Sequence, residues 1–265
     1  MKRAIFPLLI FLAITTICYA QDNEEFIVTH GPYLQNPGSD GVTIVWTTSK
    51  AAVPGINLTN PDGQITFIRN SSDGITDGGG TLHKVRIEGL KPGTSYKYSL
   101  HSVQILKYQP YKVYYGDTLK GKDVSFVTYP LRRDKVHFTV INDVHELSGK
   151  MASYLKNNII ANQDFYFFNG DMVGFLQESK QLWPGFIDTA ASYFASSIPF
   201  YYVRGNHETR GALARELKNY FDYKDNRFYY SFDYGPVHFI VLDCGEDKPD
   251  DNRYYYGLAD MIHTG

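Results

Sequence analysis

The sequence predicts two consecutive domains of different class, an all-β sandwich followed by an α/β domain with a parallel sheet. Short strand-like runs separated by frequent turn signals fill residues 26–128, whereas strand-like and helix-like runs alternate from residue 135 onward. With 265 residues and 43% hydrophobic residues, the chain is long enough for two domains and apolar enough for each to bury a core. We therefore expect a sandwich at 26–128 and an α/β domain at 135–265.

The first 20 residues have the layout of a secretory signal peptide. Lys2 and Arg3 precede an apolar run at 4–17, and a small-residue cleavage site follows at 18–20. The apolar run is short for a membrane span, and no later segment is long and apolar enough to be one. We expect export to the periplasm, the cell surface or the extracellular space, with no transmembrane segment once residues 1–20 are removed.

Charge and cysteine content limit the classes of function. The chain has 26 Lys and Arg residues against 28 Asp and Glu residues and no basic stripe, so we expect no nucleic-acid partner. Cys244 is the only cysteine after residue 20, which excludes an internal disulfide in the exported chain. Because it follows an apolar run, we expect Cys244 to be a small packed residue.

Turn signals separate the short strands expected in the first domain. These strands lie at 42–47, 65–68, 85–87 and 96–100. Sequences rich in Pro, Gly, Asn and Asp lie between them, as at 60–63 and 91–94, and this spacing is typical of a β-sandwich. The domain contains no cluster of titratable residues with ligand spacing, so we interpret it as a structural or positioning module.

A proline-containing and charged linker at 128–134 leads into the α/β pattern. Strands are expected at 136–141, 165–168 and 200–203, with helices near 147–160, 182–194 and 211–220. A hairpin at 227–242 is expected to turn through Gly235 and Pro236. Strands that alternate with helices predict parallel βαβ units with right-handed crossovers.

Three polar segments directly follow the three predicted parallel strands. They are Asp-Val-His at 143–145, Gly-Asp at 170–171 and Gly-Asn-His-Glu at 205–208. The carboxyl ends of parallel strands meet at one edge of the sheet, which is where open α/β sheets bind their ligands. Carboxylate, imidazole and amide oxygen ligands suit hard or borderline divalent metals. The sequence therefore predicts a metal site at this edge.

In this order, with one βαβ unit between each pair, the segments resemble the signature of the calcineurin-like metallophosphoesterase family. The first domain resembles the fibronectin type III-like domain that precedes the catalytic domain in purple acid phosphatases, at Gly-Pro-Tyr-Leu-Gln (31–35) and Val-Thr-Ile-Val-Trp (42–46). Residues 90–98 resemble the corner at which a tyrosine closes fibronectin type III sandwiches. The resemblance implies a sandwich followed by an incomplete four-layer α/β/β/α domain.

The resemblance also implies a centre of two divalent ions, Mn, Zn or Fe, that activates water to hydrolyse phosphate monoesters, with diesters as the second choice. Asp143 and His145 are the implied ligands of one ion, Asp171 the bridging carboxylate, and Asn206 a ligand of the other ion. A carboxylate bridge suits metals held roughly 3.5–4 Å apart, the spacing of two-metal hydrolases. The implied partner is a phosphorylated small-molecule substrate.

Two further residues receive catalytic roles from the resemblance. His207 would contact the phosphate and protonate the leaving oxygen, and Glu208 would orient His207. A negative charge at a helix N-terminus is the alternative interpretation of Glu208. Surface salt bridges explain Arg204 and Arg210 better than phosphate contacts do, and His238 is expected to be a sheet residue and not a ligand.

The sequence departs from the family pattern in two ways. Purple acid phosphatases carry Asp-x-Gly and Gly-Asp-x-x-Tyr, whereas His145 and Gly174 stand at those glycine and tyrosine positions here. We therefore expect a pair of like divalent ions and not a purple ferric centre. The family's later histidine motifs are missing, since only His238 and His263 follow residue 208.

The missing motifs lead us to expect a C-terminally truncated metallophosphoesterase. The alternative is an inactive remnant or a non-catalytic binding module that acts through the fibronectin-like domain. A nucleotide-binding domain without hydrolysis is disfavoured, because no Gly-rich phosphate loop follows a strand.

Overall fold

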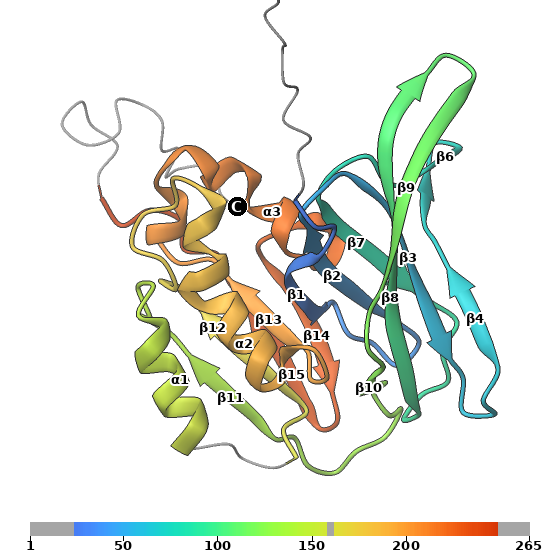
Figure 1. Cartoon of the computed structure of the whole chain (residues 1–265). Coiled ribbons are helices and arrows are strands. Elements are labelled where there is room, and N and C mark those ends of the chain that lie inside the picture. Colours follow the sequence, from blue (N-terminus) through green and yellow to red (C-terminus); the bar gives the residue numbers. More distant parts are fainter. Residues whose placement is uncertain (1–23, 158–161, 249–265) are drawn as a thin grey trace, which may run out of the picture.

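The computed structural model describes residues 24–157 and 162–248, which form a β-rich half and an α/β half (Figure 1). The expected signal peptide at 1–20 and His263 lie outside the described residues. Within the described part of the chain, no helix has the length and apolar character needed to cross a bilayer.

Two antiparallel sheets make up the N-terminal half. The first has the strand order β1-β2-β7 and the second the order β10-β8-β3-β4, with β9 paired to β8. The strands of the first sheet are β1 (Val28–Gln35), β2 (Val42–Thr48) and β7 (Leu82–Ile87). Those of the second are β3 (Ala52–Thr59), β4 (Ile65–Ile68), β8 (Ser95–Gln109), β9 (Lys112–Lys120) and β10 (Val124–Val127). Two-residue strands β5 (Ser71–Ser72) and β6 (Ile75–Thr76) pair separately.

The two sheets enclose an aromatic core that includes Trp46, Tyr98 and Phe126. The buried Trp46 indole N–H donates a hydrogen bond to the Ser102 hydroxyl at 3.1 Å, so burial leaves no donor unpaired. The Tyr96 hydroxyl accepts a hydrogen bond from the Lys91 backbone N–H at 2.9 Å, the kind of contact by which a tyrosine corner closes a sandwich. The predicted sandwich is confirmed.

Three parallel strands form the sheet of the second half, in the order β11-β12-β13. They are β11 (Phe138–Ile141), β12 (Phe165–Asn169) and β13 (Phe200–Val203). Alternate side chains of these strands point to opposite faces. Tyr166 and Phe168 belong to the core under the helices, whereas Phe165 and Phe167 pack toward the C-terminal hairpin. The predicted parallel sheet is confirmed.

The helices are shorter and less regular than the sequence predicts. Helix α1 covers Ser148–Asn157, close to its predicted position. In place of the second predicted helix, the structure has four short segments in succession. They are a 3₁₀ turn (Ser179–Gln181), a π turn (Trp183–Ile187), the short helix α2 (Asp188–Ala190) and another π turn (Ala191–Ala195). The third is a 3₁₀ segment (Ala212–Glu216) followed by α3 (Leu217–Tyr220).

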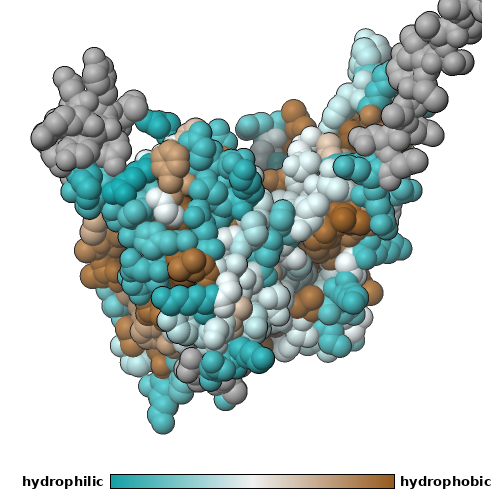
Figure 2. Space-filling model, turned by 60° about the vertical axis from the view of Figure 1, so that its left-hand side comes forward, coloured by the Kyte–Doolittle hydropathy of each residue, from teal (hydrophilic) through white to brown (hydrophobic). Residues whose placement is uncertain are grey.

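The predicted hairpin consists of β14 (Tyr230–Tyr234) and β15 (Val237–Val241), which turn at Gly235 with φ +57°. Its inner face covers the parallel sheet, whereas Ile240 and Leu242 are each 66% exposed. Figure 2 shows hydrophobic residues gathered along one edge of the molecule. The expectation for Cys244 was wrong, because β15 ends at Val241 and Cys244 lies exposed in the loop that follows.

The two halves pack against each other through the first sheet of the sandwich. Every residue of β2 is buried, and Tyr33 and Val45 belong to the same core as residues under the parallel sheet. The Gln35 side-chain amide donates to the Phe200 carbonyl at 2.9 Å. Tyr129, in the linker, stacks edge-on against Tyr234 with ring centroids 4.3 Å apart. The sandwich therefore supports the strand that leads into the third polar motif.

Candidate metal centre

The loops after β11 and β12 hold an unusual backbone conformation. Asp143, His145 and Asp171 all have positive φ, at 54°, 46° and 54°. Non-glycine residues rarely adopt this conformation, and it gathers at functional sites. The two loops are joined by backbone hydrogen bonds, from Asp143 to the Gly170 carbonyl at 3.2 Å and from His145 to the Asp171 carbonyl at 3.1 Å. The first two motifs are thus one connected unit.

A compact group of three side chains forms at this edge of the sheet. One ligand atom from each of His145, Asp171 and His207 lies within 4.8 Å of the others. The two imidazole rings meet edge-on with centroids 4.7 Å apart, and the His207 backbone N–H donates to Asp171 Oδ1 at 3.2 Å. The structure therefore places His207, which the sequence assigned to the substrate, among the candidate metal ligands.

Asp143 and Asn206, the other predicted ligands, flank this group. Asp143 Oδ1 lies 3.7 Å from His145 Nε2, but its side chain is 61% exposed and it is not in the compact group. Asn206 precedes the 3₁₀ turn His207–Thr209 and is half-buried. Among the described residues its carboxamide has no hydrogen-bond partner, so that oxygen is available to a ligand. Their role as ligands stays a prediction.

The surroundings of His207 fix which ring nitrogen is available. Its Nδ1 lies 2.7 Å from the Gly174 carbonyl oxygen, which can only accept, so Nδ1 carries a proton and Nε2 carries the free lone pair, with Arg210 Nη1 3.3 Å away. Gly174 also faces His145, since a Cβ placed on it would lie 3.7 Å from His145 Nδ1. The histidine and the glycine that depart from the purple acid phosphatase pattern are therefore neighbours.

Glu208 is fully buried and links the loops of the second and third motifs. Its Oε1 accepts hydrogen bonds from the Met172 and Val173 backbone N–H groups at 2.8 and 3.2 Å and from the Tyr202 hydroxyl at 2.9 Å. Its Oε2 accepts from the backbone N–H groups of Asp171 and Gly205, at 3.0 and 2.9 Å.

The family resemblance implied that Glu208 orients the His207 ring, but none of these five hydrogen bonds involves that ring. They join Glu208 to the loops after β12 and β13 and not to the His207 ring, which the Gly174 carbonyl orients. Gly205 permits this arrangement, because a Cβ there would lie 2.6 Å from the Asp171 nitrogen and 2.9 Å from Glu208 Oε2. Its catalytic role stays a prediction.

Comparison with known proteins identifies the second half of the chain. Residues 136–259 match the family model described as calcineurin-like phosphoesterase. The second half of the chain is therefore similar to that family. No curated protein matches the chain significantly.

Two solved structures resemble the whole arrangement of sandwich and phosphoesterase domain. One is the purple acid phosphatase PPD1 from yellow lupin (Lupinus luteus) seeds, with a TM-score of 0.55, 18% identity, and coverage of 79% of this chain and 43% of that one. The other is PhoD, with a TM-score of 0.53, 14% identity, and coverage of 84% and 53%. At these identities the likeness shows the fold alone. The chain spans about half the length of these structures.

The two arginines beside the third motif form ion pairs, but these pairs are largely buried and not at the surface as expected, since the Arg204 and Arg210 side chains are only 16% and 19% exposed. Arg204 Nε lies 3.1 Å from Asp243 Oδ1, and its guanidinium lies 3.9 Å from the Phe228 ring centroid. Arg210 pairs with the buried Glu246 at 2.7 Å. Arg210 Nη1 also lies 3.3 Å from His207 Nε2. No sequence motif indicated Glu246, which lies 36 residues after Arg210 in the chain.

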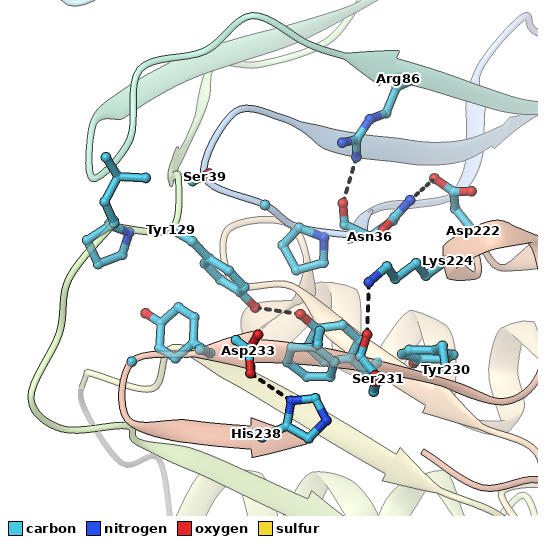
Figure 3. Close-up of a pocket in the computed structure, with 18 residues that line it drawn as sticks. Asn36, Ser39, Arg86, Tyr129, Asp222, Lys224, Tyr230, Ser231, Asp233 and His238 are labelled. Carbon is cyan, nitrogen blue, oxygen red and sulfur yellow. Dashed lines mark hydrogen bonds and ion pairs between the residues drawn. The ribbon is translucent and has the colours of Figure 1, made fainter. Parts of the chain in front are cut away.

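A cavity of about 540 Å³ lies between the sandwich and the hairpin, lined by residues apart from the candidate metal group (Figure 3). The charged groups around it have protein partners. Arg86 donates to the Asn36 carbonyl at 2.6 Å, Lys224 donates to the Ser231 carbonyl at 2.9 Å, and His238 pairs with Asp233 at 2.7 Å. The last contact agrees with the prediction that His238 is a sheet residue.

Proposed function

We propose that this chain hydrolyses phosphate esters, preferably monoesters of small molecules, at a divalent-metal centre built on His145, Asp171 and His207. The observation that carries the proposal is the compact group of two imidazoles and one carboxylate at the carboxyl ends of parallel strands, in a domain of this family. Such nitrogen and oxygen ligands suit Mn, Zn or Fe(II).

The surrounding residues offer further oxygen ligands, which fit such a centre. These are the Asp143 carboxylate and the Asn206 carboxamide, which has no hydrogen-bond partner among residues 24–157 and 162–248. When bound, divalent ions polarise phosphoryl oxygens and supply hydroxide near neutral pH, so no protein nucleophile is needed. Glu208 contributes by holding the loops that carry Asp171 and Asn206 in one geometry.

His207 has two candidate roles, metal ligand and proton donor to the leaving group, and its Nε2 atom cannot perform both at once. As a metal ligand, Nε2 carries no proton, whereas as the donor to the leaving oxygen it must carry one. His207→Gln distinguishes the roles when bound metal and turnover are both measured. Unchanged metal content with lost turnover assigns His207 to the substrate, and loss of bound metal assigns it to the metal.

The decisive experiment measures hydrolysis of an aryl phosphate by residues 21–265 with added Mn²⁺. We expect turnover by the wild type and a fall of about 100-fold or more in Asp171→Asn, since a residue that binds the metal directly matters at least as much as the residues that orient it. Asp117→Asn, an exposed position in β9, is the matched control and should retain full activity.

Two outcomes would contradict the proposal. Equal turnover by the wild type and Asp171→Asn would show that the activity does not arise at this centre. A folded wild type that binds Mn²⁺ without turnover would favour the alternative, a non-catalytic binding module.

We also propose that the chain is exported, because residues 1–20 have the pattern of a signal peptide. Cell fractionation with N-terminal sequencing tests this directly. An exported product that begins at Gln21 supports the proposal, and a cytoplasmic product that keeps Lys2 and Arg3 contradicts it.

A further inference from the structure

The β8–β9 hairpin extends beyond the sheet to which it belongs. Strand β3 pairs with β8 only as far as Gln104, so the rest of β8 pairs with β9 alone. The strands turn through Pro110 and Tyr111. Figure 1 shows the hairpin as a green ribbon that rises past the end of the sandwich. The end of this ribbon, residues 106–116, is here called the hairpin tip.

The hairpin tip exposes an unusual concentration of large side chains. Tyr111 is fully exposed, Leu106 and Tyr108 are 59% and 60% exposed, and Tyr115 is 54% exposed. Single exposed apolar residues are ordinary on protein surfaces, but a contiguous group marks an interaction surface. A two-stranded ribbon buries little surface between its strands, so packing within the ribbon does not require large side chains at these exposed positions.

The charge of the hairpin tip is positive. It contains Lys107 and Lys112 and no acidic residue. Lys112 Nζ lies 4.5 Å from the centroid of the Tyr114 ring, which leaves the ammonium beside an aromatic face. Tyrosine rings prefer the headgroup level of a bilayer, and lysines near a membrane surface are attracted by anionic lipids. The two residue types together are complementary to an anionic bilayer.

The arrangement of the rings favours a membrane over a carbohydrate chain. Lys107 is opposite Tyr114 in the strand register and Tyr108 is opposite Val113. Because neighbouring residues of a strand point to opposite faces, Tyr108 and Tyr114 lie on different faces of the ribbon, with Tyr111 at its end. A flat platform for a sugar chain would need its rings on one face. Tyr115, two residues after Val113, lies on the same face as Tyr108, so the rings occupy both faces and the end of the ribbon, an arrangement that suits immersion in a lipid interface.

We propose that the hairpin tip binds the surface of anionic lipid membranes and so holds the chain at a bilayer. The contact uses tyrosine rings at headgroup depth and the ammonium groups of Lys107 and Lys112 toward the lipid phosphates. It involves no residue of the candidate metal centre, so it is independent of the proposed hydrolysis.

Co-sedimentation of residues 21–265 with vesicles tests this inference. We expect binding to vesicles that contain phosphatidylglycerol, little binding to pure phosphatidylcholine, and weakening as salt is raised. The double variants Tyr108→Ser/Tyr111→Ser and Lys107→Gln/Lys112→Gln should each lower the bound fraction, by about tenfold in affinity. Tyr229→Ser is the matched control, because Tyr229 is also exposed but belongs to the α/β half.

Several outcomes would overturn the inference. The wild type could fail to sediment with anionic vesicles, or both double variants could bind as well as the wild type. Binding to an insoluble polysaccharide, with none to vesicles, would reassign the hairpin tip to carbohydrate. A dimer in solution that Tyr108→Ser/Tyr111→Ser dissociates would reassign it to a second copy of the chain. Because the variants lie outside the metal centre, their aryl phosphate turnover stays at the wild-type value in every case.

Discussion

Replacing Glu208 with glutamine should destabilise the phosphoesterase domain far more than an ordinary surface substitution. The carboxylate accepts five hydrogen bonds, and four of the donors are backbone N–H groups of the motif loops. A glutamine side chain has nearly the same shape but presents one NH₂ group, which cannot accept. At least two of the five donors must then lose their acceptor.

The size of the effect follows from which oxygen the NH₂ group replaces. At the Oε2 position it faces two donors, Asp171 and Gly205, and at Oε1 it faces three. The first arrangement is the less damaging one. Each lost hydrogen bond to a charged acceptor costs about 1.5–3 kcal/mol, so we expect roughly 3–6 kcal/mol of destabilisation. That is a large part of the 5–15 kcal/mol typical of a whole domain.

Thermal unfolding of Glu208→Gln and Glu216→Gln provides the test. Glu216 is exposed in the same half of the chain, so its substitution controls for the lost charge. At about 2–4 °C per kcal/mol for a domain of this size range, Glu208→Gln should lower Tm by at least 6 °C, and Glu216→Gln should leave it nearly unchanged. Equal Tm values for the two variants would refute the structural role assigned to Glu208.

Three further predictions concern other parts of the fold. Gly205→Ala should reduce Mn²⁺ binding and lower Tm, because its Cβ would lie 2.6 Å from a backbone nitrogen, whereas Gly149→Ala, with open space around it, should be neutral or slightly stabilising. Burial lowers the pKa of His83 to about 4, below its value of about 6.5 in the unfolded chain. The unfolding free energy should therefore fall by roughly 3 kcal/mol between pH 7 and pH 4, and a pH titration of His83→Gln should lack this component. Lys84→Met should cost about 2 kcal/mol or more in urea unfolding, because two carbonyls of the α/β half lose their charged donor, and an unchanged midpoint would contradict this.

The strands of the fold were largely predictable, because their signal is local. Residues 165–168 and 200–203 are continuous apolar runs, and the structure places β12 and β13 there. The helical segments were harder, since residues 182–194 have a helical apolar pattern but fold as π and α turns around Pro184. The sequence predicts only residues 96–100 of the long β8–β9 hairpin. The outer part of the hairpin is exposed on both faces, so its residues lack the apolar and polar alternation that marks a half-buried strand.

Much of the candidate site was predictable from motif order, and its detailed geometry was not. Asp171 and His145 were chosen as ligands because they follow predicted strands, and the structure brings them together. The inclusion of His207 depends on the turn at His207–Thr209 and on the Gly174 carbonyl, which no sequence pattern specifies. The buried contacts of Glu208 depend likewise on the path of two separate loops.

The packing between the two halves connects the sandwich to the strand that precedes the candidate metal centre. Phe200 begins β13, and its carbonyl accepts a hydrogen bond from Gln35 while its ring stacks on Tyr33 at 5.7 Å. Gly205 follows two residues after the end of β13, and its backbone lies so close to Asp171 that a Cβ on it would be 2.6 Å from the Asp171 nitrogen. A shift of β1 would therefore move β13 and, with it, the loop that carries Asn206 and His207. The first residue of β13 therefore connects the sandwich to the strand that precedes the candidate metal site.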